Sequence, residues 1–332
     1  MKNTKLLTYT LITASVVFWG ISFILTKELF LTEKHMTVTM LVALRLAIAS
    51  AVMLPALALT HRLQRIRRQD IKWFLLLAFC EPFIYHLCET NGVRLVSGSL
   101  ASVVIATIPL FVPFGMWLAY HQRIKPSLIV GVALSLAGVV LMLGGEIGFQ
   151  GTALQGLLFL SGAVAIAVVY TILLVRVVDH YHPLVVTTWQ NLIGLAYFLP
   201  LVLAFDASSL PLLSWSPKML MLILVLGLLC STLAYAGYNY GVRNLGASEA
   251  CIFNNAIPVF SLIAAVAIGQ EAFSWAKLLG MTIVIAGVVI AQGRPLRSLN
   301  LKIRSKKDQR DSHPTEEQRQ KSRKSICRSV LI

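Results

Sequence analysis

The chain has 332 residues, of which 57% are hydrophobic and 13% are charged, and its formal net charge is +15. Soluble globular proteins are about 45–50% apolar and about 25% charged, so this composition excludes an ordinary soluble domain. It favours a polytopic membrane protein, because each spanning helix needs about 20 mostly apolar residues.

Ten such stretches follow one another along the chain, separated by short polar loops. Numbered in chain order as spans 1 to 10, they cover residues 8–27, 38–60, 71–92, 95–120, 127–145, 153–177, 183–205, 218–241, 246–269 and 275–292. A membrane β-barrel would show short alternating segments, whereas these runs are long and uniformly apolar. The predicted fold class is therefore an all-α integral membrane protein with ten transmembrane helices.

Span 1 follows Lys2 and Lys5, as in a signal peptide, but it continues into Trp19 and Lys27 without a small-residue cleavage site. We therefore expect it to be a retained span. With the N-terminus in the cytoplasm, 23 of the 29 lysines and arginines lie on the inner side. This asymmetry predicts a cell inner (cytoplasmic) membrane protein with both termini in the cytoplasm.

The location of the charge also argues against nucleic acid as a partner, because the basic residues do not cover a soluble surface. Twelve of them lie in the tail, residues 293–332, which is polar and basic. We expect this tail to be disordered and to be attracted to anionic lipid headgroups.

Shifting the sequence by 149 residues aligns its two halves almost without gaps. Residues 97–140 and 246–289 share ten identities in 44 pairs, including Pro109 with Pro258 and a common AGVV segment. We predict two homologous repeats, residues 1–145 and 146–292. Because five spans is an odd number, the second repeat enters the membrane from the opposite side, so the repeats are predicted to be inverted.

Pro109 and Pro258 lie about 12 to 14 residues into their spans, which is near the bilayer midplane. Each proline removes one helical hydrogen bond. A packing kink would explain each proline alone, whereas the symmetric placement favours helix breaks that line a cavity.

Span 3 contains the sequence CEPFIYHLCETNG, which places several ionisable groups inside the membrane. Glu81, Tyr85 and Glu89 follow at intervals of four residues, so they share one helix face unless Pro82 kinks the helix. A carboxyl at this depth marks a substrate pathway, a proton relay or a counter-ion. The alternative is a buried ion pair with Arg45 in span 2, for which Glu89 is the expected partner; His86 is a titratable neighbour.

Further polar candidates lie in spans 7, 8 and 9. Tyr235 is deep enough to face a cavity, whereas an interfacial aromatic belt explains Tyr240 and also accounts for Tyr238. The adjacent amides Asn254 and Asn255 precede Pro258 and need partners, from neighbouring helices or from a substrate. The pair Trp189 and Gln190 is explained as well by a headgroup-level anchor as by a cavity.

The chemistry of a metalloprotein or a disulfide-bonded protein is not predicted. The five cysteines, Cys80, Cys88, Cys230, Cys251 and Cys327, lack paired spacing, and the spans contain no HExxH motif. No metal, no cofactor and no enzymatic activity are therefore expected, and the cysteines are expected to pack as small hydrophobic residues.

Several segments resemble the drug/metabolite transporter superfamily, and more narrowly its ten-span EamA family. They are FWGISF in span 1, LASVVIATIPLF in span 4, ASEACIFNNAIPVF in span 9 and the two glycine-rich spans that end in AGVV. The resemblance covers about residues 8–292 and implies a secondary transporter, commonly an exporter of small metabolites. Where relatives often carry a Gly-Glu pair between spans 4 and 5, this chain has YHQRIKP, so the resemblance assigns no role to that loop.

The expected function is alternating-access export of a small polar metabolite, zwitterionic or cationic, through a site that includes the acids of span 3. Nucleotide-sugar or sugar-phosphate transport ranks lower, because such substrates call for several deep basic residues and only Arg45 qualifies. A membrane-embedded enzyme or a channel ranks lower still. The expected partners are a small-molecule substrate and the lipid bilayer, with proton coupling and homodimer formation left open.

Overall fold

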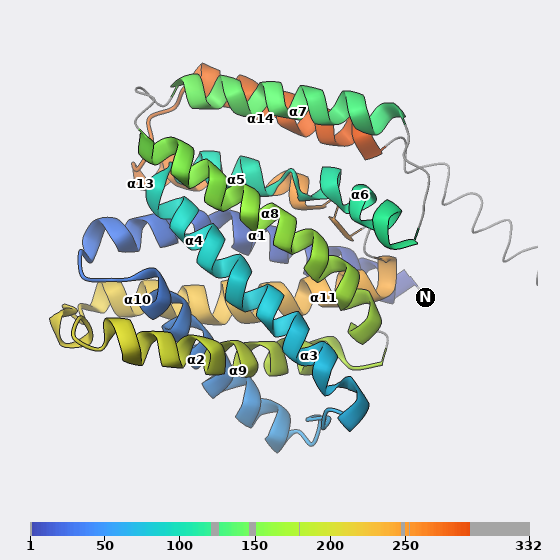
Figure 1. Ribbon diagram of the computed structural model, residues 1–332, viewed down its shortest axis with the longest axis vertical. Helices are drawn as coiled ribbons and strands as arrows, with labels where there is room; N and C mark the ends of the chain where they lie inside the picture. The colour runs from blue at the N-terminus through green and yellow to red at the C-terminus, as the bar shows by residue number, and fades with distance from the viewer. Residues whose placement is uncertain are drawn as a thin grey trace, which may run out of the picture. The chain divides into compact units, whose positions relative to one another are not determined.

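The fold was analysed in a computed structural model that describes residues 2–120, 126–145, 151–178, 180–246, 250–251 and 253–292. All regular elements in these ranges are helical (Figure 1). Seven helical segments are long and apolar enough to cross a membrane, and three shorter apolar helices complete the set. Each of the ten falls on one predicted span, so the prediction of a ten-helix, all-α membrane protein is confirmed.

Several spans are built from more than one helical piece. The first half contains α1 (Lys2–Thr32), α2 (Val38–Leu59), η1 (Arg68–Asp70), α3 (Ile71–Ala78), the π-helical turn η2 (Phe79–Ile84), α4 (Tyr85–Leu95), α5 (Gly98–Ile105), α6 (Ile108–Tyr120) and α7 (Pro126–Gly145). The second half contains α8 (Gly151–Val178), α9 (Pro183–Leu201), η3 (Val202–Asp206), η4 (Leu210–Leu212), α10 (Pro217–Val225), the π-helical segment η5 (Leu226–Leu233), α11 (Ala234–Leu245), η6 (Phe253–Ala256), α13 (Ile257–Ile268) and α14 (Trp275–Gln292).

Side-chain caps define where several of these helices begin. The hydroxyls of Thr37, Ser97 and Ser216 accept hydrogen bonds from backbone amides three residues later, at the starts of α2, α5 and α10. A capped amide is not left unsatisfied where the chain enters the apolar region, and each such cap stabilises its helix by about 1 kcal/mol.

Helical breaks occur at equivalent places in the two halves. The fourth span is interrupted at residues 106–107, and Pro109 lies in the first turn of α6. In the ninth span, η6 gives way to α13, and Pro258 lies in the first turn of α13. Proline is well tolerated in a first helical turn, where its missing N–H has no helical acceptor to lose. The third and eighth spans likewise each contain a π-helical segment, η2 and η5.

The packing of the helices repeats the internal symmetry of the sequence. Helix α1 packs along α11 and α13 of the second half, and α8 packs along α4 and α6 of the first half. A shift of 149 residues converts the first set of contacts into the second. Helices α2 and α9, which are equivalent to each other, also pack together. A two-fold relation between the halves exchanges the contacts of α1 with those of α8 in this way.

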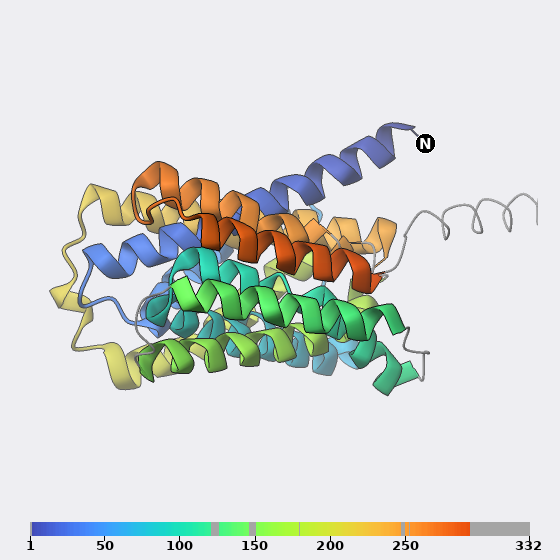
Figure 2. The same cartoon turned by 90° about the horizontal axis from the view of Figure 1, so that it is seen from above.

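Helices α7 and α14 lie side by side at one edge of the bundle (Figures 1 and 2). Their glycines allow close contact, because a Cβ built on Gly138 would lie 2.7 Å from the Gly280 oxygen and one on Gly287 would lie 2.7 Å from the Gly131 oxygen. These two contacts exchange under the repeat. Ser135 Oγ also donates to the carbonyl of Val284, its own equivalent, at 3.1 Å.

Polarity is distributed as in a protein surrounded by lipid. Large apolar side chains are widely exposed, among them Leu118, Phe205 and Trp275. Arg45, Glu81 and many hydroxyl and amide side chains are instead buried. Soluble proteins rarely bury so many polar groups, since each buried one needs a partner. The interior of this bundle is therefore the place to look for a functional site.

Candidate functional site

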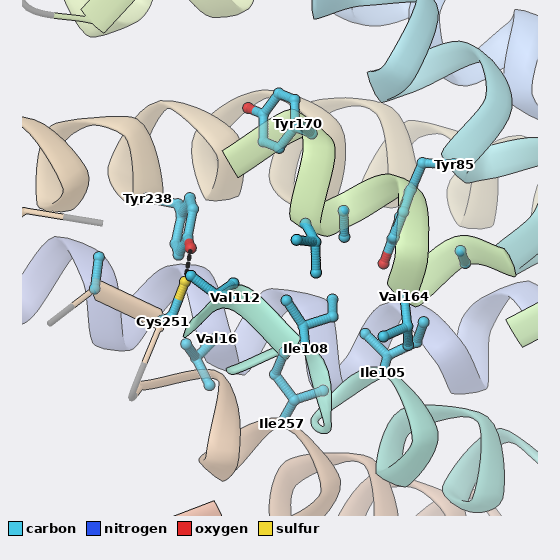
Figure 3. Packing of buried hydrophobic residues seen from close by; sticks show 14 of the residues in the cluster. Val16, Tyr85, Ile105, Ile108, Val112, Val164, Tyr170, Tyr238, Cys251 and Ile257 are labelled. Atoms are coloured by element: carbon cyan, nitrogen blue, oxygen red, sulfur yellow. Dashed lines mark hydrogen bonds between the residues drawn. The ribbon is translucent and has the colours of Figure 1, made fainter. Parts of the chain in front are cut away.

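A cavity lies inside the bundle and is lined by helices from both halves. Its lining residues are Trp19, Ser22, Phe23, Arg45, Glu81, Tyr85, His86, Glu89, Ile105, Ile108, Ala167, Tyr170, Thr171, Tyr235, Tyr238, Asn254 and Ile257. In Figure 3, Tyr85, Tyr170 and Tyr238 lie around the same group of buried side chains as Ile105 and Ile108. Ile105 and Asn254 come from the broken spans, so the breaks bring residues of both repeats to the cavity wall.

The π-helical turn η2 positions Glu81 in this cavity. Glu81 has an extended backbone, with φ −138° and ψ 117°, inside an otherwise helical span. Its carbonyl oxygen accepts a hydrogen bond from Gln190 Nε2 at 3.1 Å. Pro82 packs on α9, where a Cβ built on Gly194 would lie 2.3 Å from Pro82 Cγ. The irregular turn thus requires glycine on the neighbouring helix.

Glu81, His86 and Glu89 form a triad in which Glu81 and His86 are buried and Glu89 is partly buried. His86 Nδ1 lies 2.9 Å from Glu89 Oε2, and His86 Nε2 lies 3.3 Å from Glu81 Oε1. The Tyr85 hydroxyl donates to Glu89 Oε1 at 3.1 Å. The second oxygen of Glu81, Oε2, is buried and has no hydrogen-bond partner in the described chain. Such an atom is costly unless a ligand, water or proton satisfies it.

Arg45 lines the same cavity without an ion-pair partner. Its Nε donates to Ser231 Oγ at 3.1 Å, and no carboxylate in the described chain lies within 4.0 Å of its guanidinium. The alternative that Arg45 forms an ion pair with Glu89 is therefore not observed in the described chain. Glu89 instead contacts residues of its own span: its Oε2 lies 2.9 Å from His86 Nδ1, and its Oε1 accepts a hydrogen bond from the Tyr85 hydroxyl.

In the second half, the position equivalent to Arg45 is occupied by Gly194. Shifting by 149 residues converts the contact between Arg45 and Ser231 into the contact between Gly194 and Pro82. The place where the second span of one repeat meets the third span of the other therefore holds Arg45 against Ser231 in one case and Gly194 against Pro82 in the other. The contact between the two helices occurs twice, but a charged side chain takes part in one of the two contacts alone.

Aromatic rings form another part of the cavity wall. The Trp19 ring centroid lies 5.0 Å from those of both Tyr235 and Tyr238, and the Tyr235 ring lies 6.2 Å from His86. Trp19 Nε1 donates to the carbonyl of Cys230, the repeat equivalent of Glu81, at 3.3 Å. Aromatic faces beside carboxylates suit a ligand that carries positive charge.

A smaller pocket adjoins the triad. It shares Glu81, His86 and Tyr235 with the main cavity and is otherwise lined by Leu46, Pro82, Thr187, Gln190, Asn191 and Ser231. Gln190 Oε1 is buried here without a hydrogen-bond partner among the described residues. The amide of Gln190 therefore has one acceptor free toward this pocket.

The structure gathers most of the predicted site residues. Those that line the main cavity are Arg45, Glu81, Tyr85, His86, Glu89, Tyr235 and Asn254. Gln190 lines the smaller pocket, and Asn255 is buried but lines neither. Trp189 donates from its indole to the Gln64 carbonyl at 3.0 Å, which ties α9 to the segment between α2 and α3.

Four aromatic residues of the wall, Trp19, Phe23, Tyr170 and Tyr238, were misassigned or not predicted from the sequence. Tyr238 was expected in an interfacial belt, but it is 4% exposed and lines the cavity, where its hydroxyl lies 3.1 Å from Cys251 Sγ (Figure 3). Trp19, Phe23 and Tyr170 were not predicted. Trp19 lies within the FWGISF segment of span 1, and Tyr170 lies in the interior of span 6. Their depth within the spans is the sequence feature that could have predicted a place in the cavity wall.

Cysteine and metal chemistry do not enter this site as far as the structure describes it. Cys80, Cys88, Cys230 and Cys251 are free, while Cys327 lies outside the described residues. No group of three or more His, Cys, Asp or Glu side chains that could hold a metal ion occurs in the described ranges.

The model of the EamA-like transporter family matches residues 6–144 and 154–292, one match in each half. The chain belongs to this family. The family explains why two five-helix repeats enclose one cavity, and it supports a transport role rather than catalysis at the family level.

Curated relatives of this EamA-like transporter are themselves named as transporters. The uncharacterized transporter YetK of Bacillus subtilis (strain 168) is 25% identical over 319 residues, which cover 94% of this chain and 91% of the relative. An uncharacterized transporter of Archaeoglobus fulgidus is 26% identical over 276 residues, which cover 83% and 95%. A crystal structure at 21% identity superposes with a TM-score of 0.63 over 87% of this chain and 95% of that one, which shows the fold alone.

Proposed function

We propose that this EamA-like transporter exports a small zwitterionic or cationic metabolite across the cytoplasmic membrane by alternating access. One observation supports the proposal above the others: Arg45 and the carboxylates of Glu81 and Glu89 line one cavity without pairing to each other. An arginine fork is suited to a substrate carboxylate, and a buried carboxylate is suited to an ammonium group.

Phosphorylated substrates fit this cavity less well. Arg45 is the single lysine or arginine among its described lining residues, whereas two glutamates and several aromatic rings line it. A sugar phosphate or nucleotide-sugar carries two or more negative charges that would meet these carboxylates. Amino-acid-like and cationic metabolites are therefore the favoured class.

The proposed mechanism uses the symmetry of the two halves. Five helices per repeat place equivalent helices in opposite directions across the membrane, and the contacts of α1 and α8 exchange under the repeat. Inverted repeats of this kind allow one arrangement to open inward and its symmetry mate to open outward around a central site. The basic loops and tail argue for cytoplasmic termini, as expected from the positive-inside rule.

The experiment compares a strain that lacks the gene with strains that express the wild-type protein or Glu81→Gln. Untargeted profiling of the medium and the cell interior measures which metabolites accumulate inside the deletion strain. We expect wild type to restore export and Glu81→Gln to lower it by about tenfold or more, because a charge-assisted hydrogen bond contributes about 1.5–3 kcal/mol.

Glu316→Gln is the matched control, because Glu316 lies in the basic tail, after the last of the ten predicted spans. It makes the same chemical change, and we expect export to persist. Both variants must reach the membrane in wild-type amounts, as measured by immunoblotting. An unchanged metabolite profile on deletion and re-expression would contradict export, and normal export by Glu81→Gln would remove Glu81 from the site.

A further inference from the structure

The contacts of His86 with two carboxylates indicate how many protons His86, Glu81 and Glu89 hold together. Both ring nitrogens of His86 face carboxylate oxygens, Glu89 Oε2 at 2.9 Å and Glu81 Oε1 at 3.3 Å. A neutral imidazole carries one N–H and one bare nitrogen. If both carboxylates were ionised, that bare nitrogen would face a negative oxygen. The observed arrangement therefore contains one proton more than a neutral imidazole between two carboxylates.

The surroundings indicate where this extra proton is held. Glu89 accepts a hydrogen bond from the Tyr85 hydroxyl, and its Oε2 lies 2.9 Å from His86 Nδ1, so both of its oxygens have a polar partner. Glu81 is 3% exposed and interacts with the Tyr235 side chain, while its Oε2 accepts no hydrogen bond of ordinary geometry among the described residues. A buried carboxylate with an unsatisfied oxygen is costly in its charged form. The consistent assignment places the proton on Glu81, whose Oε1 lies 3.3 Å from His86 Nε2, while His86 Nδ1–H donates to Glu89.

The remaining groups around the triad make this assignment electrically balanced. The titratable and charged groups that face it are Cys80 and Tyr85 on its own span, Arg45 on α2, Tyr170 on α8, Cys230 on η5, and Tyr235 and Tyr238 on α11. Phenols and thiols are ordinarily neutral near pH 7, so Arg45 is the charged member of this set. With Glu81 protonated, the positive charge of Arg45 balances the negative charge of Glu89.

We propose that Glu81, His86 and Glu89 together hold one exchangeable proton, and that releasing it opens the site for the cationic group of the substrate. In the release step the O–H bond of Glu81 breaks, and its electron pair stays on Oε1. The proton passes to water on the side to which the cavity is open. The vacated site carries one net negative charge, which the cationic group neutralises. Proton and metabolite thus compete for one site, which couples their movement in opposite directions.

This inference rests on the proposed transport function for its physiological meaning, but the proton itself is measurable without a substrate. The probe is the carboxyl group of Glu81, observed by infrared spectroscopy of the purified full-length protein in detergent micelles. Near neutral pH we expect a C=O band of a protonated carboxyl that shifts when the glutamates carry ¹³C. The band should disappear as the pH is raised and should be absent from Glu81→Gln.

Glu271→Gln is the matched control, because Glu271 forms an ion pair with Lys277 outside the cavity and is expected to be ionised. It should leave the band unchanged. If Glu81→Gln does not fold, Glu81→Asp carries the test: the band must then follow ¹³C-labelled aspartate instead of glutamate. His86→Asn should change the frequency of the band, since the carboxyl loses its acceptor.

Absence of any protonated carboxyl that Glu81 variants remove would overturn the proposal. That outcome together with intact export would leave a transporter without this proton site. A clear band together with an unchanged metabolite profile would instead support the proton site and contradict export, so the two failures are distinguishable.

Discussion

At the scale of single residues, Arg45 has the least complete set of contacts in the cavity. A buried guanidinium carries five N–H donors, and the contact found for it among the described residues is the one from Nε to Ser231. Its remaining donors are therefore available to a planar anionic group. A carboxylate that binds them in a bidentate way would gain specificity as well as energy.

This geometry predicts a distinction between arginine, lysine and a neutral residue at position 45. We expect Arg45→Gln to lower export by about tenfold or more, and Arg45→Lys to raise the apparent KM while keeping measurable transport, because lysine keeps the charge but loses the fork. The measurement is export rate against substrate concentration for the metabolite found by profiling.

Arg94→Gln provides the comparison for this test. Arg94 lies in the last turn of α4, is exposed and lies over the Phe30 ring with 5.8 Å between Cζ and the ring centroid. Its loss should leave transport close to wild type. Equal transport by wild type and Arg45→Gln would show that no substrate carboxylate binds this arginine.

At the scale of elements, the contact between α9 and η2 supports the whole triad. Pro82 fits against α9 because position 194 has no side chain. Gly194→Ala would bring a Cβ within 2.3 Å of Pro82 Cγ, so we expect a loss of about 1–3 kcal/mol in stability from overpacking. The triad should shift with it, which lowers transport further. Thermal unfolding of the micellar protein measures the first effect, and the export assay measures the second.

Gly162→Ala is the control for this glycine. It also lies within a helix, and its Cβ would meet Cys88 Sγ at 3.5 Å, an ordinary contact. Alanine is the better helix former, so this variant should be as stable as wild type or slightly more stable. The prediction fails if both alanine variants unfold at the same temperature.

The helical elements also show which features of the fold and the site can be predicted from the sequence. Hydropathy placed the ten spans, because each apolar run must be a helix in lipid. Spacing placed Glu81, Tyr85 and Glu89 on one face and brought Arg45 to the same depth. It did not reveal the π-helical turn at Glu81, because such a turn depends on space made by a distant glycine, Gly194.

The same limit explains the misassigned partners. Depth along a helix predicted that Arg45 and Glu89 meet, but rotation about the helix axis decides contact, and His86 lies closer to Glu89. Tyr238 illustrates a second limit. Aromatic residues near a span end are common at membrane interfaces, so composition alone favoured a belt over the cavity wall. Burial in the folded bundle distinguishes the two.

At the scale of the whole molecule, several contacts join the two halves at the end of the bundle where α1 leads into α2. Our proposed topology places this end outside the cell. Glu271 accepts hydrogen bonds from the Ser99 hydroxyl at 2.5 Å and from the Ser99 amide at 3.1 Å. Glu28 bonds to Lys218 and Gln270 of the other half. Alternating access requires these contacts to break when the cavity opens outward.

The Glu271 contact is charged under ordinary conditions. Burial raises the pKa of its carboxyl, but hydrogen bonds from Lys277 and Ser99 outweigh that effect, so the pKa lies below its usual value. A lowered pKa in the folded state means that ionised Glu271 contributes stability above the usual glutamate pKa. That contribution is lost as the pH falls through the lowered value. Near neutral pH the ion pair and hydrogen bonds of Glu271 are therefore intact.

A covalent link across this contact tests whether the halves must separate here. In a protein whose five native cysteines are replaced, Ser99→Cys and Glu271→Cys are joined by a short bis-maleimide reagent added from outside. We expect the link to reduce export to the background of the deletion strain, because the outer end can no longer open. Each single cysteine variant, treated with the same reagent, should transport as it does untreated. Undiminished export by a fully cross-linked protein would contradict a mechanism in which α5 separates from the segment between α13 and α14 in every transport cycle.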